Sequence, residues 1–113
     1  MAGGTIKNDG WILAGSEYGQ IAQTNPKITY PSAAKELLIS VIIDTTDNPT
    51  YTGVFLVSNI QNSENLFLGG YYNASNDTAV ANVNHDAANR QIWFRNAKMG
   101  TVNKGTVYVY YKT

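Results

Sequence analysis

The sequence predicts an all-β protein, an antiparallel, jelly-roll-like β-sandwich of about eight short strands. Residues 106–113 carry the clearest signal, because valine and tyrosine alternate there with the period of two that a half-buried strand requires. Further short runs of β-branched and aromatic residues, which fit a pleated surface, recur along the chain. Turn residues separate these runs about every ten positions, as in sandwiches and barrels.

The length of the chain predicts one domain. A chain of 113 residues has the usual size of a single domain, and its 43% hydrophobic content is enough to form a core. We therefore expect a single β-sandwich over residues 11–113. Residues 1–10 are expected to be a flexible lead or a junction to a preceding segment.

The N-terminal half is expected to contain strands at 11–14, 19–24, 27–30, 35–43 and 51–57. In the fourth of these, alternate positions from Leu37 to Ile43 face one way and those from Leu38 to Ile42 face the other. Both sets are largely apolar, which predicts a central strand covered on both sides. Helix is the competing assignment, since residues 33–38 are good helix formers, but the β-branched run that follows favours a strand. Gly53 is expected to mark a bulge.

The C-terminal half is expected to open with a hairpin. Strands at 66–72 and 78–84 would be joined across 73–77, where asparagine and aspartate suit a tight tip. A turn at 85–89, a strand at 91–95 and a loop at 97–105 are expected before the final strand.

Composition excludes several classes of function. Charged residues make up only 14% of the chain, and the eight basic and eight acidic side chains cancel, so we expect no nucleic-acid partner. Cysteine is absent, which excludes disulfides, cysteine-ligated zinc and a thiol nucleophile. No apolar run is long enough for membrane insertion. The start of the chain lacks the pattern of a signal peptide, so we expect synthesis in a cytoplasm without standard export.

Four sequence features, taken in order, resemble a known family. They are the opening run 11–15, the segment 34–41 after a proline-containing turn, the hairpin residues 69–75 and the closing strand 107–112. Together they resemble the C-terminal receptor-binding or tip modules of bacteriophage tail-fibre and tail-tip proteins, over about residues 11–112. The resemblance implies a β-sandwich in the virion tail, usually a homotrimer beside other tail proteins. It also implies recognition of bacterial surface glycans, but assigns no site residue.

Aromatic and amide side chains are the expected saccharide ligands. A sugar ring stacks its apolar face on an aromatic plane while its hydroxyls bond to amides and carboxylates. The first candidate site is the predicted hairpin tip, formed by Tyr71, Tyr72, Asn73, Asn76 and Asp77. Trp93 and Arg95, on one face of a strand, form the second. Core or trimer-interface packing remains the alternative for the tyrosines, and Trp11 is expected to pack in the core or at the junction.

No catalytic residue, cofactor or metal is predicted. His85, the only histidine, lies beside Asp86, but no nucleophile-elbow motif surrounds any serine. We interpret it as a solvated side chain in a turn. Asp44, Asp47 and Asn48 match no standard calcium loop, and glycoside cleavage needs two carboxylates at a fixed separation that sequence spacing does not define.

The favoured interpretation is host attachment. The chain would be a non-catalytic phage tail module that binds a bacterial surface saccharide, with avidity from several weak sites in a homotrimer. One alternative is a purely structural trimerisation or capping domain of a tail or baseplate. A second alternative is a cell-wall hydrolase or esterase.

Overall fold

The all-β sandwich predicted from the sequence is confirmed. The computed structural model describes residues 10–20, 26–43, 50–70, 81–94 and 104–113. Within these ranges it contains strands and one 3-10 helical turn, Val57–Asn59. The strands are β1 (Ile12–Gln20), β2 (Lys27–Thr29), β3 (Glu36–Ile43), β4 (Thr50–Leu56), β5 (Asn65–Gly70), β6 (Ala81–Asp86), β7 (Gln91–Trp93) and β8 (Lys104–Lys112).

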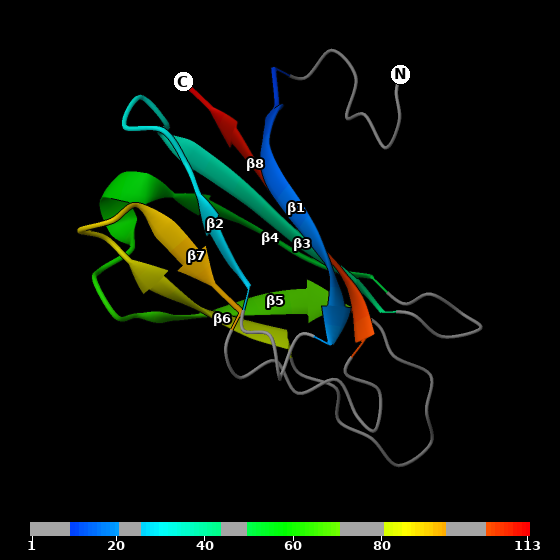
Figure 1. The fold of residues 1–113 in the computed structure, drawn as a ribbon. Helices are drawn as coiled ribbons and strands as arrows, with labels where there is room; N and C mark the ends of the chain where they lie inside the picture. The colour runs from blue at the N-terminus through cyan, green and yellow to red at the C-terminus, as the bar shows by residue number, and fades with distance from the viewer. Residues whose placement is uncertain (1–9, 21–25, 44–49, 71–80, 95–103) are drawn as a thin grey trace.

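The eight strands lie in the hydrogen-bonded order β1-β8-β3-β4-β5-β6-β7-β2 (Figure 1). All of the pairs are antiparallel. The link between β4 and β5 consists of only two residue pairs, Tyr51 with Gly70 and Thr52 with Gly69. The chain folds over at this link into a first sheet, β1-β8-β3-β4, and a second sheet, β5-β6-β7-β2. Pairing of β1 with β8 and of β2 with β7 is the jelly-roll element, whereas β3 to β6 form a meander.

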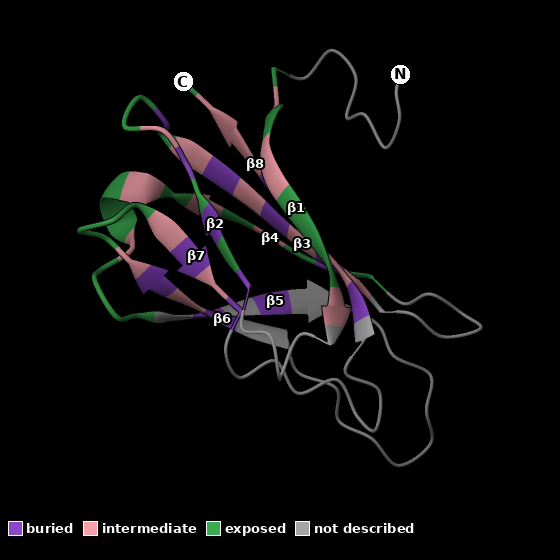
Figure 2. Ribbon diagram, viewed as in Figure 1, coloured by how far each residue is buried: buried purple, intermediate pink, exposed green. Residues whose placement is uncertain are grey.

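The core lies between the two sheets and follows the alternation read from the sequence (Figure 2). Inward side chains of β3 and β8 that are fully buried include Leu37, Ile39 and Val109, and Tyr111 packs partly buried against them. From the second sheet, Val83 and Ile92 meet them at exposures of 1% and 0%. Hydrophobic burial on this scale is the main stabilising term of such a domain.

The outward face of β3 differs from the prediction. The strand is central in its sheet, between β8 and β4, but Leu38 and Ile42 are only half-buried. On the neighbouring β4, Val54 and Leu56 are 56% and 50% exposed. The expectation that β3 is covered on both sides is therefore wrong for the described chain, because the second sheet packs against one face only.

The expectation of a bulge at Gly53 is also wrong. Gly53 pairs in regular register with Ile39. A Cβ atom there would lie 2.7 Å from the Phe55 ring, so the position needs glycine for close packing. The register shift lies instead in β1, between Leu13 and Gly15.

Several strand ends differ from the predicted ranges. β1 continues to Gln20, so the separate strand expected from residue 19 does not exist within the described residues. The predicted hairpin forms between β5 and β6, with Leu66 opposite Val83. Trp11 is half-buried and absent from the core cluster, with the Lys112 Nζ 4.7 Å from its ring centroid.

Candidate polar site on the second sheet

Most of the predicted site residues fall outside the described part of the chain. This applies to Tyr71, Tyr72, Asn73, Asn76 and Asp77, and also to Arg95. Trp93 is described, at the end of β7. The site that follows is therefore built around Trp93.

Trp93 lies on the outward face of the second sheet. The register of β2, β7 and β6 places Lys27, Trp93 and Asn84 in one row across the sheet. In the row below, Gln91 lies between Thr29 and Asp86, and its amide nitrogen donates to the Thr29 hydroxyl at 3.2 Å. We call these six residues the polar face.

A pocket of about 220 Å³ opens on the β6 side of the polar face. It is lined by Asn62, Ser63, Asn84, His85, Asp86 and Trp93. The volume is below the roughly 300–1,000 Å³ of typical small-molecule sites, so it suits a single small ring. Its walls offer one indole, two side-chain amides, one hydroxyl and one carboxylate.

Hydrogen bonds hold the loop before β5 against β6 and give the pocket its shape. The Ser63 N–H donates to the His85 carbonyl at 2.7 Å, and the Asn84 side-chain amide donates to the Ser63 carbonyl at 3.1 Å. The Ala87 N–H donates to the Asn62 side-chain oxygen at 2.9 Å. Ser63 adopts a φ of 63°, in the left-handed region that few residues other than glycine occupy.

Asp86 supplies a negative charge at the rim. Its carboxylate accepts hydrogen bonds from the Asn89 side chain at 2.9 Å and from the Asn89 N–H at 3.1 Å. These bonds, the side-chain one first, lower the pKa of Asp86 below its ordinary 3.8. The carboxylate is therefore ionised near neutral pH and acts as a hydrogen-bond acceptor.

Lys27 occupies the side of Trp93 away from the pocket. Its Nζ lies 4.4 Å from the indole centroid, a cation–π contact between neighbouring strands. β2 and β6 flank β7 on opposite sides, so Lys27 and Asn84 lie in register on either side of Trp93. The cation–π contact orients the ring that forms the pocket wall.

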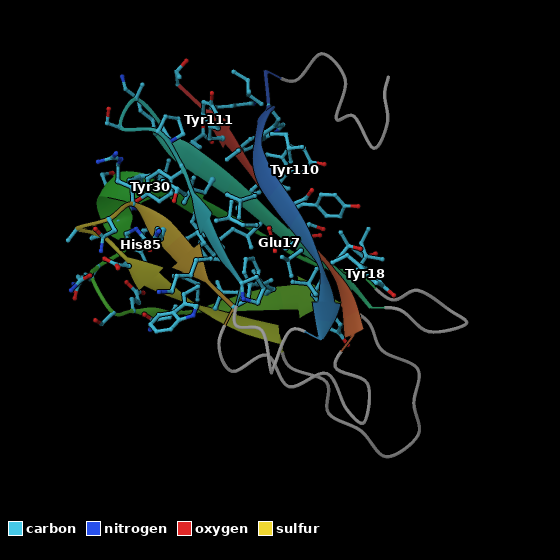
Figure 3. The ribbon with its side chains drawn as sticks, in the orientation of Figure 1. Glu17, Tyr18, Tyr30, His85, Tyr110 and Tyr111 are labelled. Carbon is cyan, nitrogen blue, oxygen red and sulfur yellow. The ribbon has the colours of Figure 1, made fainter. Side chains whose placement is uncertain are left out.

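His85 is not the solvated turn residue that we expected. It lies in β6, is 1% exposed and stacks on Tyr30, with ring centroids 5.9 Å apart (Figure 3). The Gln61 carbonyl, 3.0 Å away, can only accept, so Nδ1 carries the proton. Nε2 is then the acceptor for the Tyr30 hydroxyl at 2.7 Å. Both ring nitrogens are engaged in holding the second sheet to its loop, and neither contacts a serine.

The alternation of Val83 and His85 was the available sequence signal for this burial, since both occupy inward positions of one strand. The pocket residues Asn62 and Ser63 had no such signal. They come from an irregular loop 21 or more residues away along the chain from their partners, Asn84 in β6 and Ala87 directly after it.

Within the described ranges, no helix is long and apolar enough to cross a membrane. The same ranges contain no group of three or more histidine, aspartate or glutamate side chains that could hold a metal ion. Comparisons of the chain with protein-family models, with curated proteins and with solved structures find no match. The assignment of a function therefore depends on the chain's own residues.

Proposed function

We propose that the chain is a non-catalytic attachment module that binds a bacterial surface saccharide, as part of a phage tail fibre or tail tip. The observation that carries the saccharide proposal is the pocket beside Trp93, where an indole, amides and a carboxylate converge in a space the size of one sugar ring. The phage assignment comes from the sequence resemblance described above.

Binding would combine ring stacking with hydrogen bonds. The indole of Trp93 offers an apolar surface to the C–H face of a sugar. The Asp86 carboxylate accepts from sugar hydroxyls, while Asn62 and Ser63, both exposed, offer an amide and a hydroxyl at the other rim. One shallow site of this kind binds weakly, and several copies on one virion supply avidity.

The test compares two tryptophan variants. Trp93→Ala removes the pocket wall, and Trp11→Ala is the matched control, because each indole lies under one lysine and only Trp93 lines the pocket. Binding to purified bacterial wall polysaccharides is measured by calorimetry, with a glycan array to find the ligand. We expect Trp93→Ala to lose at least about tenfold in affinity, the value of one stacking contact of roughly 1.4 kcal/mol.

Unchanged binding by Trp93→Ala, or an equal loss in Trp11→Ala, would contradict this site. A parallel double variant, Tyr71→Ala with Tyr72→Ala, tests the hairpin tip predicted from the sequence. Loss in that variant alone would move the site to the tip while leaving the proposed function intact. Failure of the unaltered protein to bind any wall saccharide would reject the function.

The purely structural alternative has one observation in its favour, the exposed apolar side chains on the outward side of the first sheet, such as Val54 and Leu56. A hydrolase is not supported by His85, whose imidazole is buried and bonded to Tyr30 and Gln61.

A further inference from the structure

A second pocket lies at one end of the sandwich and shares no lining residue with the pocket beside Trp93. Its volume is about 430 Å³, and it is lined by Ala34, Lys35, Leu56, Val57 and Ser58. The turn before β3 and the 3-10 turn after β4 form its two sides, toward the same end of the molecule (Figure 1). Its volume falls within the roughly 300–1,000 Å³ of typical small-molecule sites. We call it the end pocket.

Main-chain hydrogen bonds fix both sides of the end pocket. The Val57 N–H donates to the Lys35 carbonyl at 2.9 Å, which joins the two sides to each other. The Lys35 N–H donates to the Lys112 carbonyl at 2.8 Å. The Ala34 N–H donates to the Pro31 carbonyl at 3.0 Å. The end pocket is therefore preformed, and a ligand would meet its side chains rather than these main-chain donors.

The lining of the end pocket combines an apolar wall with one cation. Ala34, Leu56 and Val57 supply the hydrocarbon, and a ligand that covers the 50% exposed Leu56 removes apolar surface from water. Lys35 is exposed, and its ammonium makes no hydrogen bond or ion pair with any described residue. A lysine beside apolar surface lays its stem along that surface and keeps its charge at the rim. Ser58 adds one hydroxyl.

Glu36, the acidic residue next to Lys35 along the chain, forms no ion pair with it. Successive side chains of a strand point to opposite faces, and Glu36 lies opposite Lys112 in the register of β3 and β8. The charge of Glu36 is therefore offset by a lysine of the neighbouring strand, and an anion in the end pocket gains Lys35 as its partner.

We propose that the end pocket binds a small amphipathic carboxylate, with its apolar body against Leu56 and Val57 and its single negative charge at Lys35. The lining contains no aromatic ring on which a sugar could stack, unlike the pocket beside Trp93. A neutral apolar molecule would fill the same space without engaging the ammonium. The inference does not rest on the proposed saccharide binding, because the two pockets have separate linings.

The test titrates the full, isotope-labelled chain with octanoate and with octanol at millimolar concentration and follows the amide chemical shifts. The two probes share an apolar body and differ in the charge of the head group. We expect octanoate to shift the amides of residues 34–35 and 56–58 saturably. It should bind roughly two- to fivefold more tightly than octanol, the range for one exposed ion pair. Shortening octanoate to hexanoate should lower affinity by roughly two- to fourfold per methylene removed.

Two pairs of variants separate the head group from the wall, and far-ultraviolet dichroism checks that each variant keeps its strands. Lys35→Gln should lower the affinity for octanoate to that for octanol, whereas Lys104→Gln, at the other end of β8 from Lys112, should change neither. Leu56→Ala should weaken both probes roughly three- to tenfold. Val54→Ala is its control, because Val54 is 56% exposed on the same strand and face but does not line the end pocket.

Several results would overturn the proposal. They are binding of neither probe, amide shifts outside the end pocket, and equal affinities of the unaltered chain for octanoate and octanol. An equal loss in Lys104→Gln and Lys35→Gln would show that the head group senses overall charge and not Lys35. An equal loss in Val54→Ala and Leu56→Ala would place the probes on the exposed apolar side chains of β4 instead of in the end pocket.

Discussion

The bond between Tyr30 and His85 allows a quantitative test of what holds the second sheet together. Tyr30 is 2% exposed, and its hydroxyl donates to the His85 Nε2 at 2.7 Å. The variant Tyr30→Phe keeps the buried ring but loses this hydroxyl. Because His85 is buried, its Nε2 is then left without a donor, at a cost of about 1–3 kcal/mol in the free energy of unfolding.

The expected change in melting temperature follows from the length of the chain. An unfolding entropy of about 2.1 cal/mol/K per residue over 113 residues makes 1–3 kcal/mol equivalent to a fall of roughly 4–13 °C. Tyr111→Phe is the matched control, since Tyr111 packs against the core but its hydroxyl bonds to no described residue. Its expected effect is within about 0.5 kcal/mol. Calorimetry and urea unfolding measure both variants.

The alkaline limb of the stability curve provides an independent readout. Burial raises the pKa of the Tyr30 hydroxyl above its ordinary 10.0, although the Arg90 charge opposes this. The unfolded chain therefore loses this proton first. The contribution of Tyr30 is complete below about pH 10 and is lost as the pH rises through the folded-state pKa. Tyr30→Phe should flatten this limb relative to the unaltered chain. Equal losses of stability in the two variants, or an alkaline limb that Tyr30→Phe leaves unchanged, would refute the reasoning.

Two further predictions concern glycine packing and the rim carboxylate. Gly53→Ala should lower the free energy of unfolding by about 1–3 kcal/mol, since the added Cβ would lie 2.7 Å from the Phe55 ring. The double variant Gly53→Ala with Phe55→Leu should regain most of that stability, as measured by urea unfolding. Asn89→Ala removes a hydrogen bond that lowers the pKa of Asp86. The lowered pKa adds stability above pH 3.8 that is lost as the pH falls below it. In Asn89→Ala the free energy of unfolding, measured across that range, should therefore depend less steeply on pH. An acid limb unchanged by the substitution would disprove the role of Asn89.

The strand pattern was readable from the sequence because it is local. Alternation along β3 and β8 identified the inward residues correctly, since a side-chain period of two depends only on the backbone of one strand. The helix alternative at residues 33–38 is wrong throughout, because Ser32 and Ala33 form a turn and β3 begins at Glu36. Fold class and core therefore followed from neighbouring residues.

The pocket beside Trp93 depends on contacts that no local pattern encodes. Trp93 was identified as an aromatic on a strand face, but Asn62 and Ser63 reach it only because the loop before β5 is bonded to β6. His85 was misread because its environment is formed by Tyr30, 55 positions away along the chain.

By itself, the sequence determined that the chain forms short alternating strands in an antiparallel sandwich, because period, turn chemistry and β-branched content act within a few residues. Only the tertiary structure decided which faces of the two sheets pack against each other. Among the described residues, the fold at the β4–β5 link buries one side of each sheet and leaves exposed apolar side chains on the outward side of the first sheet and the polar face on the second. Coverage of a face depends on how layers pack, and the alternation of side chains along a strand carries no information about what lies opposite.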